Sequence, residues 1–185
     1  MAIKDRYNFQ VYPRTVEQAN EFDPKGIEFL SGSFAAGSAQ HTIGRAAIFG
    51  DGIVVDSALS TDFCEAFLAD ILSYLSSQFG LTYRPEMIHT KIYTSELIVR
   101  TDKDLDGLFA PLAAVREQLD LLTGFRFEPI GFGFSIDLQV SATKPAPFKF
   151  EREINKNFSQ QWYYSCAPLP TGQHEDLLRR MELLL

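Results

Sequence analysis

The side chains best suited to chemistry lie in one short stretch, FGDGIVVDSALSTDFCEAF, at residues 49–67. An apolar run there ends at Asp56 and Ser57, and Ser60 and Thr61 follow just before a helical pattern. Hydroxyl groups at the start of a helix lie beside free backbone N–H groups and the positive end of the helix dipole, which together favour an anion. The same hydroxyls also serve as ordinary helix caps. The sequence therefore allows two interpretations of Ser60 and Thr61, an anion-binding site and a cap.

A second candidate chemistry is proton transfer by histidine, whose side chain titrates near neutral pH. His89 precedes a β-rich segment, where it could act as a general base together with Asp56 and Ser57. The three histidines show neither His-x-His nor i, i+4 spacing, so their positions point to no metal site. His174 lies in the first turn of the last expected helix, where we expect a surface or capping residue. The catalytic candidates are thus His89, Asp56 and Ser57.

The sequence lacks the common motifs of cofactor sites and nucleophiles. No Gly-x-Ser-x-Gly elbow occurs, and the GFGF of residues 131–134 lies inside an alternating strand pattern instead of opening a helix. Cys64 and Cys166 are far apart, which excludes a zinc site built on paired cysteines. We therefore expect no cofactor and no metal. The sequence leaves open whether the two cysteines form a disulfide or stay reduced in a cytosolic protein.

The charge balance bears on the partners that the protein can have. The 185 residues include 17 Lys and Arg against 24 Asp and Glu, a formal charge of −7. A nucleic-acid interface needs clustered cations, and no run of Lys or Arg is present. No apolar run is long enough to span a bilayer, and the first residues lack the apolar core of a signal peptide. The sequence thus predicts a cytoplasmic protein that binds neither nucleic acid nor membrane.

The spacing of apolar residues predicts the helices that must position these side chains. A first helix is expected over residues 61–79, because its apolar residues recur on one face with a period of 3.6 residues. Ser60 or Thr61 can cap its start, and Gly80 can close it in the left-handed conformation. A second amphipathic helix is expected within residues 104–124, and it should either start near Ala110, with Pro111 at its first position, or kink at that proline. Its inward face should consist of Leu108, Leu112, Val115, Leu119 and Leu122.

Alternation of apolar and polar residues predicts the strands. Glycines at positions 50 and 52 separate two short apolar runs as a hairpin turn would, and residues 131–140 alternate strictly. Two further strands follow with short links, so the pairing should be antiparallel. We expect an α+β fold, a mostly antiparallel twisted sheet with the two main amphipathic helices packed on one face and a C-terminal helix. One domain should span residues 1–185, with an irregular segment at 1–40 and the α+β core at 41–185.

Aromatic residues suggest where a partner could bind. The chain holds 16 Phe, 7 Tyr and 1 Trp, and such side chains are enriched both in cores and in interfaces. Because alternate residues of a strand point to opposite faces, one face of residues 161–167 can be core while the other exposes either Tyr163 or Trp162 and Tyr164. The candidate interaction residues are Phe148, Phe150, Arg152, Trp162, Tyr163 and Tyr164.

These observations favour a non-catalytic interaction protein, which would be an adaptor, an inhibitor or an assembly component. We expect it to be homo-oligomeric and to act through aromatic and small-residue surfaces, because strong fold signals occur without a cluster of titratable residues. Two alternatives stay open. One is a small-ligand-binding protein or hydrolase-type enzyme with a pocket near His89 and Asp56. The other is an acidic protein that sequesters a basic partner.

Overall fold

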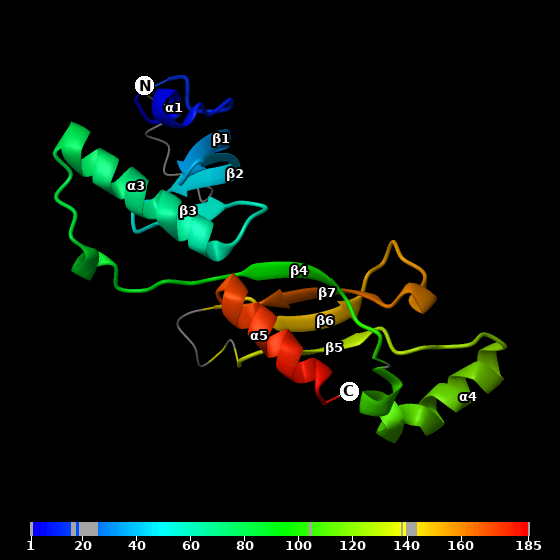
Figure 1. Ribbon diagram of the computed structural model, residues 1–185. Coiled ribbons are helices and arrows are strands. Elements are labelled where there is room, and N and C mark those ends of the chain that lie inside the picture. The colour runs from blue at the N-terminus through cyan, green and yellow to red at the C-terminus, as the bar shows by residue number, and fades with distance from the viewer. Residues whose placement is uncertain are drawn as a thin grey trace. The chain divides into compact units, whose positions relative to one another are not determined.

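The computed structural model describes residues 2–15, 18, 26–103, 105–137, 139 and 144–184. Helices and antiparallel strands confirm the α+β class. The chain divides into two compact units, Met1–Lys91 and Ile92–Leu185, and each unit has its own sheet (Figure 1). The sheet that we expected to be single is therefore two sheets. That the whole chain folds as one domain stays a prediction, because compactness alone does not show whether two units unfold together.

The first unit is a three-stranded antiparallel sheet with one long helix packed on it. The sheet order is β1-β2-β3, and the turn between β2 and β3 lies at the predicted glycines. Backbone bonds between Val11 and Leu30 extend the sheet beyond β1. The elements of this unit are α1 (Ala2–Tyr7), β1 (Ile27–Ala36), β2 (Ala39–Ile48), β3 (Ile53–Asp56), α3 (Thr61–Phe79) and the 3₁₀ helix η1 (Pro85–Met87).

Helix α3 confirms the first predicted helix and both of its ends. The Ser60 Oγ accepts a hydrogen bond from the Phe63 N–H (3.3 Å), and Gly80 closes the helix with φ of 66°. Phe63, Phe67 and Ile71 are buried, as their spacing requires. They pack against aromatic and aliphatic residues of the sheet and of the N-terminal segment, namely Tyr7, Phe9, Phe29, Ile43 and Ala46.

The described part of residues 1–40, the segment that we expected to be irregular, contains regular elements. Residues 27–36 form β1, and residues 39 and 40 begin β2. The small residues of this segment allow close packing, because a Cβ at Gly32 would collide with the ring of Phe9. Asp70 of α3 holds the N-terminal helix, since it accepts hydrogen bonds from Arg6 Nη2 (2.9 Å) and from the Tyr7 hydroxyl (2.6 Å).

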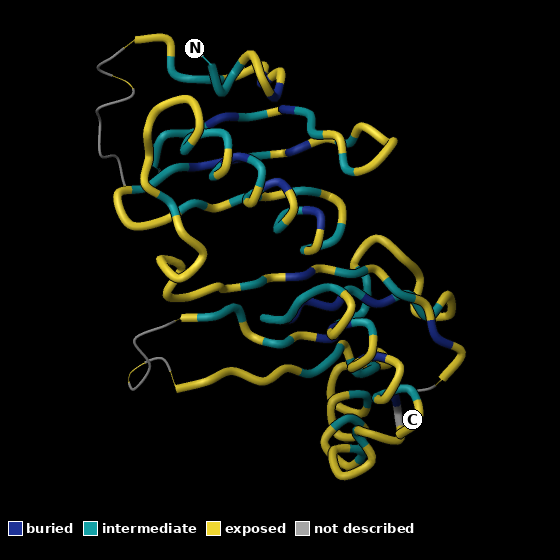
Figure 2. Tube along the Cα trace, turned by 60° about the vertical axis from the view of Figure 1, so that its left-hand side comes forward, coloured by how far each residue is buried: buried dark blue, intermediate teal, exposed yellow. Residues whose placement is uncertain are grey.

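The second unit is a four-stranded antiparallel sheet in the order β4-β7-β6-β5, with α5 packed on one face (Figure 1). Its core contains Leu105, Phe150, Tyr163 and Leu178, and Figure 2 shows the buried residues of this unit in dark blue. The elements are β4 (Ser95–Arg100), the 3₁₀ helix η2 (Leu105–Leu112), α4 (Ala113–Thr123), β5 (Gly131–Phe134), β6 (Phe148–Arg152), the 3₁₀ helix η3 (Phe158–Gln160), β7 (Trp162–Ala167) and α5 (Thr171–Glu182).

The second predicted helix differs from expectation in both its start and its packing. Pro111 lies inside η2, and the α-helix begins only at Ala113, which fits the inability of proline to continue a helical hydrogen-bond ladder. The structure describes every residue of α4, and none of them is buried. The inward face predicted from the spacing is instead exposed at Leu108, Leu112, Val115, Leu119 and Leu122.

The strand predicted over residues 131–140 is shorter than its alternation suggested. It covers Gly131–Phe134, and residues 138 and 140 lie outside the described residues. Gly131 has φ of 152°, and a Cβ there would collide with the Phe150 carbonyl oxygen of β6. The glycines of β5 therefore allow its backbone to lie close to the backbone of β6. No helix in the described part of the chain has the length and apolarity needed to cross a membrane.

Candidate interaction site at the β4 edge

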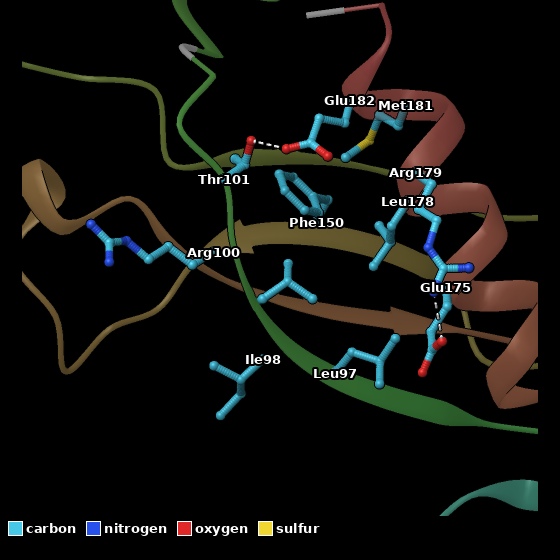
Figure 3. A pocket seen from close by; sticks show the side chains of 11 residues that line it. Leu97, Ile98, Arg100, Thr101, Phe150, Glu175, Leu178, Arg179, Met181 and Glu182 are labelled. Atoms are coloured by element: carbon cyan, nitrogen blue, oxygen red, sulfur yellow. Dashed lines mark hydrogen bonds and ion pairs between the residues drawn. The ribbon is translucent and has the colours of Figure 1, made fainter.

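A pocket of about 450 Å³ lies between β4 and α5 in the second unit, and we name it the β4–α5 pocket. Figure 3 shows Leu97, Phe150 and Leu178 between the strand and the helix, whereas Ile98 and Arg100 extend from the other side of β4. The lining residues are Leu97, Ile98, Val99, Arg100, Thr101, Phe150, Glu175, Leu178, Arg179, Met181 and Glu182. The pocket thus has an apolar floor and a charged rim.

Four polar residues of the rim, Thr101, Glu175, Arg179 and Glu182, already have partners within the chain. Arg179 forms ion pairs with Glu175 (3.3 Å) and Asp176 (2.8 Å). The Thr101 hydroxyl donates to Glu182 Oε1 (2.6 Å). These pairs tie the polar side chains of the rim to one another, and the floor between them offers apolar contact.

The backbone of β4 offers unused hydrogen-bonding groups beside this pocket. The Thr101 N–H donates to the Gln161 carbonyl oxygen (3.4 Å), and β4 pairs with β7 in the same register. Since every second residue of an antiparallel strand bonds to the same neighbour, the odd-numbered residues of β4 bond to β7. The N–H and C=O groups of Glu96, Ile98 and Arg100 therefore point to the free edge. No further strand pairs with that edge among the described residues.

The side chains of these same three residues form the outer face of β4, the side away from α5. Ile98 is 61% exposed, and Glu96 and Arg100 are exposed on either side of it. Tyr164 of β7 is the residue opposite Ile98, and its hydroxyl lies beside Glu96. Burial, together with the nearby carboxylate, raises the pKa of Tyr164. No carboxylate in the described ranges forms an ion pair with Arg100.

A buried polar cluster holds α5 against the same sheet, and we name it the His174 cluster. His174 Nδ1 lies 2.8 Å from the Ser95 Oγ, and Nε2 lies 2.8 Å from the Ser165 Oγ. The Ser165 hydroxyl donates to the Lys149 carbonyl oxygen (3.0 Å), so it accepts from Nε2–H. Ser95 then donates to Nδ1, and a neutral imidazole satisfies both contacts. The expectation of a surface His174 was wrong, because the side chain is fully buried.

The His174 cluster brings a histidine and two hydroxyl groups together inside the second unit. Ser95 and Ser165 are buried, as is the imidazole between them, so all three groups are closed to solvent. Burial lowers the pKa of His174, and Glu175 opposes this only in part. The cluster joins β4, β7 and α5, and its role is to hold the helix in place. Spacing could not reveal it, because Ser95 and His174 are 79 residues apart.

The structure decides which aromatic residues of the predicted interaction set reach the surface. Phe150 and Tyr163 are buried, and their rings stack at 4.8 Å between centroids. Trp162 and Tyr164 lie half-buried on the other face of β7. Phe148 is half-buried and packs against the core. The sequence left open whether the accessible face of β7 carries Tyr163 or carries Trp162 and Tyr164. In the structure it carries Trp162 and Tyr164.

Arg152, the remaining member of that set, is engaged within its own unit. Its Nε donates to the Pro129 carbonyl oxygen (3.2 Å), and its Nη1 donates to the Phe158 carbonyl oxygen (2.9 Å). The guanidinium also lies over the rings of Phe158 (4.7 Å) and Tyr163 (5.4 Å). With its side chain only 8% exposed, Arg152 fastens the loop around residues 158–161 to the sheet.

The catalytic candidates lie in the first unit, and the described contacts do not join them. Asp56 forms an ion pair with Arg45 (3.3 Å). The Ser57 hydroxyl donates to the Thr42 carbonyl oxygen (3.0 Å), and His89 is exposed. No hydrogen bond links His89 to Asp56 or Ser57 among the residues that the structure describes. An enzymatic role for these residues stays a prediction.

The anion-site, cysteine and metal predictions have different outcomes. The Ser60 Oγ is engaged by a helix N–H, which supports its role as a cap, while anion binding at Ser60 and Thr61 stays a prediction. Cys64 and Cys166 are free thiols in different units. Burial raises the pKa of both thiols. In the described part of the chain no group of three or more His, Cys, Asp or Glu residues could hold a metal ion.

Similarity to known proteins adds no constraint on the function. The chain matches no protein-family model, no curated protein and no solved structure. The functional argument therefore depends on the β4 edge, the β4–α5 pocket and the surfaces around them.

Proposed function

We propose that this protein is a non-catalytic protein-interaction protein that binds an extended strand on the free edge of β4. The observation that carries the proposal is the combination of an unpaired strand edge with an apolar pocket directly beside it. Main-chain hydrogen bonds to such an edge supply affinity, and a pocket that accepts alternate side chains supplies specificity. The proposal includes a cytoplasmic location, which the two free thiols fit.

The other described strand edges support the choice of β4. The outer edge of β1 is used in part by Val11, whose N–H and C=O both bond to Leu30. β5 has four residues, two of which are glycines that weaken a strand. β4 has six residues, SELIVR, with no Gly to weaken the strand and no Pro or Lys to protect its edge, and its two charges are of opposite sign. β3 also lies at an edge, but it has only four residues, so β4 is the longest of these strands with a fully free edge.

The β4–α5 pocket gives the added strand a place for its side chains. Leu97 and Val99 point from β4 toward α5, where Leu178 and Met181 continue the apolar surface. Residues directly opposite each other in an antiparallel pair point to the same face of the sheet. Alternate apolar residues of an added strand would thus cover this surface. A volume of about 450 Å³ can hold such side chains.

Amide hydrogen exchange, followed residue by residue by NMR, tests the proposal. The probes are synthetic eight-residue peptides with apolar residues at alternate positions and varied charges at the others, together with one peptide of scrambled order. We expect at least one alternating peptide to slow exchange at Ile98 and at the two flanking outward amides, Glu96 and Arg100. Exchange at Leu97 and Val99, which already bond to β7, should change little.

Two proline substitutions provide the matched control. Ile98→Pro removes an outward N–H from β4 without removing a bond to β7, and proline is tolerated at such edge positions. Ile53→Pro does the same at β3, where the bond from the Phe49 N–H to the Gly52 carbonyl oxygen places the Ile53 N–H on the outer edge. Peptide binding should be lost in the first variant and kept in the second. Equal binding by both variants, or no protection by any peptide, would contradict the proposal.

A further inference from the structure

We infer that the strand bound by β4 is the β4 of a second copy of this chain, in antiparallel pairing about a two-fold axis at Ile98. This inference rests on the proposed function, because it names the strand that the free edge accepts. In a two-fold pairing, if residue i of one copy faces residue j of the second copy, then residue j of the first copy faces residue i of the second. The sequence of β4 can therefore be tested against itself, register by register.

The backbone allows only a few registers. Outward-pointing groups of one strand must meet outward-pointing groups of the other, so even-numbered residues of β4 must pair with even-numbered residues. Three such registers keep most of the strand paired. In the first, Ile98 lies opposite Ile98 of the second copy and Glu96 lies opposite its Arg100. In the second, Glu96 lies opposite its Ile98, and in the third, Glu96 lies opposite its Asp102.

Charge selects the first of these registers. It places Glu96 opposite Arg100 twice, once on each side of the axis, and opposite charges on facing strand positions stabilise the pair. The second register leaves both charges opposite uncharged residues. The third brings two carboxylates together, which is unfavourable. Arg100 forms no ion pair in the described part of one chain, so the second copy would supply the carboxylate that it lacks.

The same register completes the apolar surfaces on both faces of the joined sheets. Leu97 lies opposite Val99 of the second copy, and both point toward α5, where they extend the floor of the β4–α5 pocket. On the outer face Ile98, which is 61% exposed in one chain, contacts its own symmetry mate. One strand thus supplies hydrogen bonds, paired charges and apolar contacts to an identical strand. The two four-stranded sheets would become one sheet of twice the width.

A charge-exchange experiment tests both the partner and the register. Analytical ultracentrifugation of the full chain at low salt should show a reversible dimer. Glu96→Arg places two arginines opposite each other, and Arg100→Glu places two glutamates opposite each other, so each single variant should dimerise on the order of tenfold more weakly. The double variant Glu96→Arg/Arg100→Glu should dimerise as the wild type does. An equimolar mixture of the single variants should form a heterodimer, because both facing pairs are then of opposite sign.

A cysteine crosslink tests the position of the axis independently. In a hydrogen-bonded antiparallel pair, facing Cα atoms lie about 5.5 Å apart, within the range that a disulfide spans. Ile98→Cys should therefore give a covalent dimer under mild oxidation. Leu121→Cys on α4, a position 77% exposed, is the matched control and should give far less. Trp162 fluorescence and circular dichroism confirm that each variant is folded.

The outcomes separate this inference from the proposed function. A wild-type chain that stays monomeric while an alternating peptide protects the Ile98 amide would overturn the second-copy inference and keep the strand-binding function. A monomer that no peptide protects would overturn both. If the charge changes do not alter dimerisation and the Ile98→Cys variant does not crosslink, the dimer uses another surface, such as the exposed leucines of α4. That outcome would also overturn the inference.

Discussion

His174 and Ser95 contact each other directly, with 2.8 Å between the imidazole Nδ1 and the serine Oγ, although 79 residues separate them in the chain. Ser165 binds the opposite nitrogen at the same distance. The imidazole thereby joins β4, β7 and α5, and β4 and α5 are the two elements on either side of the β4–α5 pocket. The position of α5 over the sheet depends on this contact as well as on apolar packing.

Removing either serine should destabilise the second unit. Ser95→Ala leaves Nδ1 without a donor, and Ser165→Ala leaves Nε2–H without an acceptor, so each should lower the free energy of unfolding by about 1–3 kcal/mol. Trp162 is the only tryptophan and lies in this unit, so its fluorescence during urea unfolding reports the change. Ser135→Ala, at an exposed position, should change the free energy by less than about 0.5 kcal/mol. Equal effects of all three variants would contradict the structural role of the His174 cluster.

The stability of the second unit should fall as the pH drops below about 6.5, the ordinary pKa of histidine. Burial lowers the pKa of His174 in the folded chain, so folding favours the neutral imidazole. Its contribution is therefore complete above the unfolded pKa and is lost as the pH falls from there toward the folded pKa. The slope for one proton is at most about 1.4 kcal/mol per pH unit.

Urea midpoints of Trp162 fluorescence between pH 7.5 and 5.5 measure this dependence. The groups that face the imidazole are the hydroxyls of Ser95 and Ser165 and, more weakly, the carboxylate of Glu175. His174→Asn should be less stable at pH 7.5 and should lose the extra slope below pH 6.5. A variant with the slope of the wild type would show that another group titrates.

Asp70 should contribute measurably to the stability of the first unit, because it accepts hydrogen bonds from both Arg6 and the Tyr7 hydroxyl. Tyr7 is buried, and burial together with the bond to Asp70 raises its pKa. Tyr7→Phe removes only the hydroxyl and should cost about 1 kcal/mol, whereas Asp70→Ala leaves that buried hydroxyl without its acceptor and should cost more. Asp5→Ala, which removes an exposed ion pair to Lys4, should change the free energy of unfolding least of the three, because solvent screens that pair. Urea unfolding followed by far-UV circular dichroism measures all three, and the reverse order would contradict the assignment.

Gly131→Ala should destabilise the second unit by about 2 kcal/mol or more, because it combines a strained backbone with a collision. The φ of 152° disfavours any side chain, and the new Cβ would meet the Phe150 carbonyl oxygen. Gly107→Ala is the control, since nothing lies within 4 Å of a Cβ at that position. Trp162 fluorescence in urea compares the two variants. A tolerated Gly131→Ala would mean that β5 can move away from β6 at little cost.

The two units should unfold in separate transitions, because each has its own core and its own sheet. Trp162 fluorescence reports the second unit, and far-UV circular dichroism reports both. We expect the two urea curves not to coincide. Coincident curves with one midpoint would instead support the sequence-based prediction of a single domain over residues 1–185.

Local patterns in the sequence predict individual elements well in this chain. The helix over residues 61–79 follows from its apolar period, and its ends follow from Ser60 and Gly80, whose effects depend only on neighbouring residues. The hairpin at residues 50 and 52 is local in the same way. The leucine spacing of residues 108–122 identifies an apolar face but not what covers it, and in the structure those leucines are exposed.

The sequence by itself determined the α+β class, the first long helix with its caps and the strand-forming segments, because these depend on periodicity and on residues a few positions apart. Only the tertiary structure decided that the strands form two sheets and that β4 lies at an edge. It also decided that His174 is buried between two serines. Strand order requires pairing between β4 and β7, more than 60 residues apart in register, and no local propensity encodes such a pairing. The candidate site depends on that order, because the same six residues in a central strand would have no free edge.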